Sequence, residues 1–151
     1  MMGIDQHRGE KSSYNRGEYS DTLLGGKTIT SLLAWALSEG IEVRIWYVGL
    51  SRVDLHIARV RSRVEKGGHE ISEDRIRERY TRSRLNLIQL LPKLTELLVY
   101  DNSEEADPQV GEMPKPTLVL HVVQGRVETC DLTRVPEWAK SIVAAATRLR
   151  D

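Results

Sequence analysis

The chain has 151 residues, of which 40% are hydrophobic, and its 22 basic side chains are balanced by 22 acidic ones. A chain of this length buries roughly two-thirds of the surface that it exposes when unfolded, which is enough for one domain. The neutral balance argues against a protein that holds nucleic acid through its overall charge, and the single cysteine excludes an internal disulfide. No apolar stretch approaches the ~20 residues of a membrane span, so we expect a cytoplasmic protein without a membrane partner.

The predicted elements begin after a polar stretch. Residues 1–20 contain few apolar side chains and no periodic pattern, so we expect a poorly ordered tail, followed by a single domain over residues 21–151. Apolar residues then recur at helical spacing from Thr28 to Leu37, and Gly40 is typical of a helix stop. Residues 41–49, IEVRIWYVG, predict a strand buried on both faces. The aromatic residues of this region are expected in the core: Trp35, Trp46 and Tyr47.

Two helices and a second strand are predicted next. The first helix opens at the capping-box-like segment Ser51–Asp54 and closes at Gly67-Gly68, and the second runs from Ser72 to about Leu91. Residues 96–100 predict a strand, residues 117–129 a hairpin, and Pro136 the first turn of a last helix that reaches about Arg150. The order strand, helical crossover, strand implies parallel pairing, and therefore an α/β fold.

The strongest chemical signal is the arginine content of residues 52–84. Arginines outnumber lysines 16 to 6 in the chain, and nine of these arginines lie in this window, which has a net charge of +4. On each predicted helix the basic residues form a stripe about 100° away from the apolar stripe. The two stripes are Arg52, His56, Arg59 and Arg63, and Arg75, Arg79, Arg82 and Asn86. Guanidinium groups from both helices would bind a phosphate from two sides, whereas a solvated helical hairpin with ordinary surface pairing explains the same pattern.

Two other segments are candidates for ligand contacts. The segment Gly25-Gly26-Lys27-Thr28 ends like a Walker A loop, but Asp21 stands where the loop needs its first glycine, so we interpret it as a turn whose Lys27 can meet an anion at a helix N-terminus. Asp101 and Asn102 follow the second strand at the end where open α/β sheets bind ligands, and such residues are equally common at strand exits. The histidines lack metal-ligand spacing, so no metal site is predicted. Nucleic acid is not an expected partner, because the charge is balanced and no aromatic ladder is present.

Four motifs occur together at fixed spacing: LGGKTIT at residues 24–30, GGH at 67–69, IRERY at 76–80 and YDNS at 100–103. In this combination, over residues 21–103, the chain resembles the carboxyl-terminal part of the zeta-toxin-like P-loop kinases, a group that includes toxins of toxin–antitoxin pairs. The resemblance implies a parallel-sheet, P-loop-kinase-like core with an arginine-rich helical lid and a C-terminal β-hairpin plus helix. It also implies ATP-dependent phosphoryl transfer to a small molecule, with Mg²⁺.

The resemblance assigns roles to individual residues. The catalytic group would comprise Asp21, Arg59, Arg63 and Arg79. Contacts to the nucleotide or to phosphate would come from Lys27, His69, Arg77, Arg82, Asp101 and Asn102.

The resemblance does not extend to the Walker A strand and loop with which the family begins. We therefore expect a domain truncated at its N-terminus that keeps recognition of an anion or nucleotide phosphate, with weak or no turnover alone. One alternative is a working half that needs a P-loop-bearing partner chain. Another is a non-catalytic interaction module or homodimer built on the degenerate kinase fold.

Overall fold

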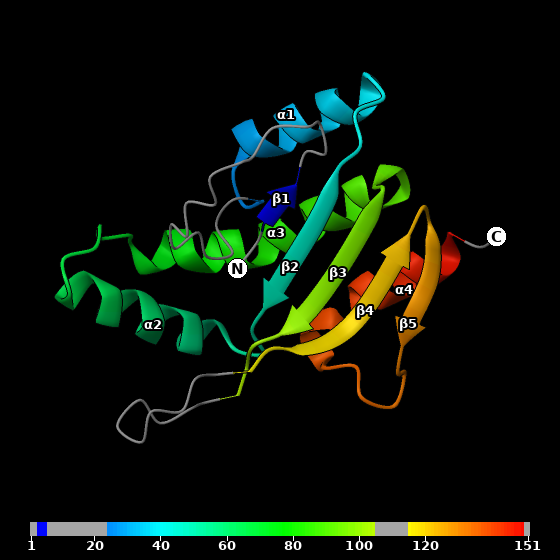
Figure 1. Ribbon diagram of the computed structural model, residues 1–151. Helices are drawn as coiled ribbons and strands as arrows, with labels where there is room; N and C mark the ends of the chain where they lie inside the picture. Colours follow the sequence, from blue (N-terminus) through cyan, green and yellow to red (C-terminus); the bar gives the residue numbers. More distant parts are fainter. Residues whose placement is uncertain (1–2, 6–23, 105–114, 150–151) are drawn as a thin grey trace.

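The computed structural model describes residues 3–5, 24–104 and 115–149. Figure 1 shows one sheet accompanied by helices, and the elements in chain order are β1 (Gly3–Asp5), α1 (Lys27–Ser38), β2 (Arg44–Gly49), α2 (Val53–Glu65), α3 (Glu73–Leu90), a 3₁₀ turn (Leu91–Lys93), β3 (Glu96–Asp101), β4 (Thr117–Val123), β5 (Arg126–Cys130), a second 3₁₀ turn (Glu137–Ala139) and α4 (Lys140–Arg148). The predicted α/β class is confirmed, but the expected parallel-sheet core is not, because β2 and β3 are the one parallel pair among the described strands.

The five strands form one mixed sheet in the order β1-β2-β3-β4-β5. β2 and β3 are parallel, in register from Arg44 opposite Glu96 to Gly49 opposite Asp101, and the remaining neighbours are antiparallel. The predicted parallel pair and C-terminal hairpin are therefore confirmed. β1, in which residues 3–5 of the expected tail pair with β2, was not predicted. Three residues are too few to give a periodic signal, and this strand forms only by pairing with a strand far away in the chain. Residues 6–20 lie outside the described part.

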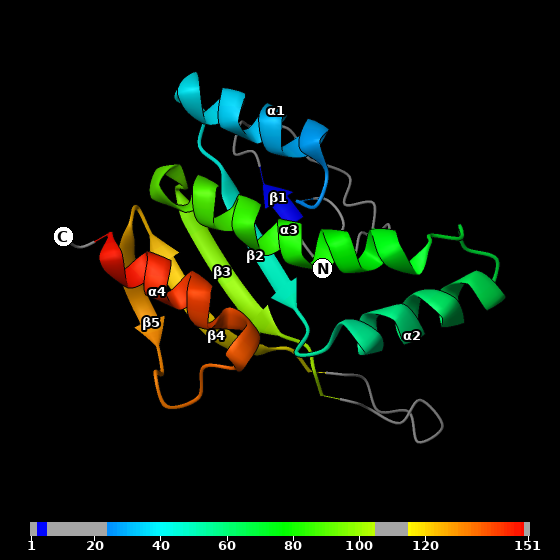
Figure 2. The same cartoon turned by 180° about the vertical axis from the view of Figure 1, so that it is seen from behind.

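α3 and α4 cover one face of the sheet, and α1 packs beside α3 at the end of the sheet formed by β1 and β2 (Figure 2). The alternate residues of β2 and β3 that point to this side are buried, whereas Trp46, Leu98 and Tyr100 on the other face are half-buried. None of the described helices covers that second face (Figure 1). The core under the helices includes Ile45, Tyr47, Leu97, Val99, Leu120, Leu87 and Ile142.

Two of the three aromatic residues expected in the core are not buried. Tyr47 is buried, Trp46 is half-buried on the open face of the sheet, and Trp35 is 57% exposed. Trp35 lies on the side of α1 opposite to Leu33 and Ala36, which pack into the core. Because α1 is apolar on both sides, its periodicity does not reveal which side packs.

Several element ends differ from the predicted ones. β2 begins at Arg44 and not at Ile41. Gly40, at φ +75°, ends α1, and the amide of Ile41 donates a hydrogen bond back to Ala36 O. Neither α2 nor α3 has a side-chain hydrogen bond at its N-cap, so the capping-box pattern at Ser51 is not used. Pro136 precedes a 3₁₀ turn, and α4 begins only at Lys140.

α2 and the first half of α3 form a hairpin that projects from the sheet (Figures 1 and 2). Its buried residues Ile57, Val60 and Ile76 make a small apolar cluster, separate from the main core. In the described part of the chain, no helix has the length and apolar character needed to cross a bilayer.

Candidate functional site

The α2–α3 hairpin places the two basic stripes on one side of the molecule. α2 leaves the carboxyl end of β2 and α3 returns toward the sheet, so the helices run antiparallel (Figure 1). Each stripe residue directly precedes a residue on the packed face of its helix, as Arg59 precedes Val60 and Arg75 precedes Ile76. In a pair of antiparallel helices, residues that directly precede the packed face point to the same side of the pair. We call this the stripe side: Arg52, His56, Arg59 and Arg63 of α2 and its N-cap, with Arg75, Arg79, Arg82 and Asn86 of α3.

The opposite side of the hairpin carries arginines that are matched by acids. Arg77 Nη2 donates to Asp54 Oδ1 at 3.2 Å, and Arg61 pairs with Glu73. A hollow of about 310 Å³ between the helices is lined by Arg61, Glu73 and Glu65 together with apolar residues of the hairpin. No stripe residue lines this hollow. Arg77 is two residues from Arg79 on α3 and pairs with Asp54, so the two arginines point to different sides of the helix.

On the stripe side the arginines outnumber the acids. Arg82 pairs with Glu78 one turn earlier, and Arg52 lies 3.9 Å from Asp54. Arg59, Arg75 and Arg79 have no carboxylate within ion-pair distance in the described ranges. Arg59 and Arg79 are half-buried, which strengthens the field that they exert on an approaching anion.

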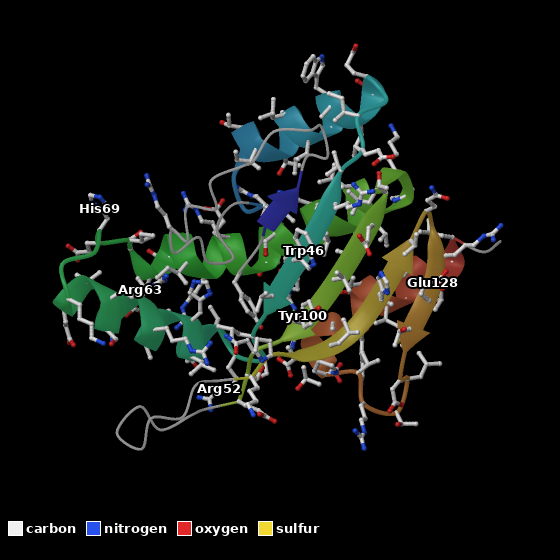
Figure 3. The ribbon with its side chains drawn as sticks, in the orientation of Figure 1. Trp46, Arg52, Arg63, His69, Tyr100 and Glu128 are labelled. Carbon is white, nitrogen blue, oxygen red and sulfur yellow. The ribbon has the colours of Figure 1, made fainter. Side chains whose placement is uncertain are left out.

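Three further stripe-side or neighbouring residues differ in exposure. His56 is only 3% exposed, so this member of the stripe is a packing residue as well as a polar one. Arg63 is half-buried on α2. His69 is exposed and projects from the turn at the far end of the hairpin, away from the sheet (Figure 3).

Three hydrogen bonds fix the hairpin at the carboxyl edge of the parallel strands. Arg59 Nη2 donates to Asn102 O at 3.1 Å, and Tyr80 Oη donates to Leu50 O at 2.8 Å. Ser51 N donates to Ser103 Oγ at 2.7 Å, which ties the ends of β2 and β3 together. The stripe side therefore begins at the strand ends, the position where open α/β sheets bind ligands.

Asn102 and Asp101 differ at this edge. Asn102 Oδ1 is buried, and no hydrogen-bond partner is present for it in the described ranges. Asp101 Oδ1, in contrast, accepts hydrogen bonds from Trp138 Nε1 at 3.2 Å, from Ser103 N at 3.2 Å and from Ser103 Oγ. One oxygen of the Asp101 carboxylate is therefore engaged in hydrogen bonds within the protein.

Trp138 is a contributor to this edge that sequence reasoning missed. Its ring packs over Gly49, where an added Cβ would lie 2.3 Å from a ring atom. Trp138 is 37 residues from Asp101 in the chain, and no local pattern signals such a contact.

The Gly25-Gly26-Lys27 segment packs against α3 beside Arg79. An added Cβ at Gly25 would lie 2.8 Å from Arg79 Cβ, and Asn86 Nδ2 donates to Leu24 O at 2.5 Å. The first glycine is thus required by a close approach to α3 and not by a phosphate loop. Lys27 is the first residue of α1 and is exposed. Asp21 lies outside the described residues.

Part of the chain is similar to a curated bacterial protein. A segment of 60 residues is 37% identical to an uncharacterized protein of Haemophilus influenzae; it makes up 40% of this chain and 43% of that protein. No family model matches the chain, and no solved structure matches it.

Proposed function

We propose that this chain is the carboxyl-terminal part of a zeta-toxin-like kinase domain. On this proposal it binds a phosphate-bearing small molecule, such as a nucleotide, on the stripe side of the α2–α3 hairpin. The observation that supports it is the asymmetry of the hairpin. Arg61 and Arg77 on the opposite side each have a carboxylate partner, whereas on the stripe side only some of the arginines do. Arg59, Arg75 and Arg79 have no such partner in the described ranges.

The chemistry of these groups fits a phosphate. A guanidinium presents two parallel N–H donors that match two phosphate oxygens, which an ammonium group cannot do. Arg59 from α2 and Arg79 from α3 would supply such contacts from two helices. Lys27 and the N-terminus of α1, which adjoin Arg79 through the Gly25 contact, would add positive potential.

We expect the chain alone to bind such a ligand but to carry out little or no phosphoryl transfer. Transfer needs a backbone cradle for the β and γ phosphates and oxygen ligands for Mg²⁺. The cradle motif is incomplete at Asp21, and one oxygen of Asp101 is occupied by three donors. Within the described ranges no group of three or more His, Cys, Asp or Glu side chains is arranged to hold a metal ion. The residues present do not fit Mg²⁺, and we derive no step through it.

Isothermal titration of the full chain with ATP, ADP and a UDP-sugar at millimolar concentration tests the proposal. We expect binding that weakens with added salt, and Arg59→Ala or Arg79→Ala to weaken it about tenfold or more, because a charged hydrogen bond contributes ~1.5–3 kcal/mol.

Arg134→Ala is the matched control, since Arg134 is exposed and pairs with Asp131 far from the hairpin. If none of the three ligands binds, or if Arg134→Ala weakens binding as much as Arg59→Ala, the proposal is wrong. Absence of binding is the result expected for the alternative, a non-catalytic interaction module.

A further inference from the structure

α1 is apolar on two opposite sides. Its inner side, with Leu33 and Ala36, packs into the main core. Its outer face, which we define as Thr28, Ser31, Leu32 and Trp35, is exposed, with Leu32 at 55% and Trp35 at 57%. Leu32 and Trp35 are one turn apart on this face, and adjoining exposed apolar side chains mark interaction sites. This outer face therefore has the character of an interface.

Charge distinguishes α1 from its neighbours. Lys27, at the first position, is its one charged residue, whereas α2 and α3 are dense in arginine and glutamate. At the other end, Glu39 follows α1 as its C-cap and is exposed. The outer face thus consists of an uncharged centre, a cation at one end and an anion at the other.

We propose that the outer face of α1 pairs with the same face of a second copy of this chain, with the two helices antiparallel around a twofold axis. An axis midway between Lys27 and Glu39 crosses the outer face at the level of Leu33, near the middle of the helix. It places Lys27 of each copy beside Glu39 of the other. The same register sets Leu32 of one copy against the region of Ala34 and Trp35 of the other, with Ser31 leaving room for the indole.

Two features favour a second copy over an unlike partner. In this pairing the Lys27–Glu39 contact occurs twice, once on each side of the axis, so that both charged ends of each helix have a partner, as a twofold interface requires. It also opposes the two helix dipoles favourably. The proposal does not rest on anion binding, because none of the stripe-side arginines takes part in it.

The size of the face predicts a weak dimer. A helix of 12 residues is about 18 Å long, and a single pair of such helices buries less than the ~800 Å² per partner of a standard interface. Association should therefore depend on concentration in the micromolar range or above.

Sedimentation equilibrium of the full chain over a wide concentration range tests the pairing. We expect the average mass to rise from the 17.2 kDa monomer toward twice that value. Leu32→Glu should weaken association at least tenfold, because it sets a charge in the uncharged centre. Leu85→Glu is the matched control: Leu85 is 56% exposed but lies on α3, and this variant should associate like the wild type. Circular dichroism checks that both variants fold.

A charge exchange tests the register. Lys27→Glu and Glu39→Lys should each weaken association, and the double variant should restore it, since the exchanged charges meet again across the axis. A chain that stays monomeric at every concentration overturns the proposal. It is equally overturned by a dimer that persists in Leu32→Glu, or by a double variant no better than the single ones.

Discussion

At the scale of single residues, the thiol of Cys130 at the end of β5 has a defined electrostatic environment. Burial raises the pKa of Cys130, and the negative charge of the adjacent Asp131 raises it further. Hydrogen bonds from Thr133 lower the pKa of Asp131, so this carboxylate is charged throughout the range in which the thiol titrates.

The rate of alkylation by iodoacetamide reports the fraction of thiolate at each pH. We expect the midpoint of the rate–pH profile above the ordinary cysteine value of about 8.5. Asp131→Asn should move this midpoint down only in part, because burial, the larger cause, remains. Glu137→Gln, an acid further along the chain, should leave the profile unchanged. A midpoint at or below the ordinary value would contradict the expectation.

Residues whose environment depends on tertiary contacts were the least predictable. Helical spacing alone sets which residues share a face, so it places Ile57 and Val60 on one face of α2, and these residues pack with Ile76 of α3. It did not indicate the burial of His56 or the exposure of Trp35, since hydrophobicity does not tell which of two sides of a helix meets the sheet.

At the scale of elements, one buried hydrogen bond joins the sheet to its covering helix. The hydroxyls of Tyr47 on β2 and Ser83 on α3 are 2.9 Å apart, and these residues are 4% and 0% exposed. Ser83→Ala should lower the free energy of unfolding by about 1–3 kcal/mol, because it leaves a buried hydroxyl without this partner.

A double-mutant cycle measured by urea unfolding isolates the bond. Tyr47→Phe with Ser83→Ala should cost less than the sum of the single substitutions, since the two groups are coupled. Tyr100→Phe, on the half-buried open face of β3, is the control and should cost little. Additive losses in the cycle would show that the contact contributes nothing.

The sequence patterns predicted which helices and strands exist better than where they end. The two parallel strands and the helices between them have strong periodic signals. Gly40 correctly marked the end of α1, but the start of β2 at Arg44 depends on backbone geometry, including the hydrogen bond from Ile41 N to Ala36 O. The carboxyl edge was predicted from strand order, whereas the bond from Trp138 to Asp101 joins distant residues and had no signal.

At the scale of the whole molecule, the apolar interior is divided. The main core joins the sheet to α1, α3 and α4, and the hairpin cluster contains only a few buried side chains. The hairpin reaches the sheet edge mainly through polar contacts, those of Arg59 and Tyr80 among them. Elements with few buried apolar contacts open at lower free energy than the core strands. The proposed anion site therefore lies on the less stable part of the fold.

Amide hydrogen exchange tests this division. We expect the amides of α2 to exchange through local opening, with protection well below that of β3, whose Leu97 and Val99 are fully buried. Ile76→Ala should reduce protection in α2 further and leave β3 protected against local opening, because Ile76 belongs to the hairpin cluster alone. A phosphate-bearing ligand that binds the stripe side should raise protection in α2 selectively, since it binds only the closed hairpin. Equal protection of α2 and β3 would mean that the hairpin and the sheet unfold as one unit.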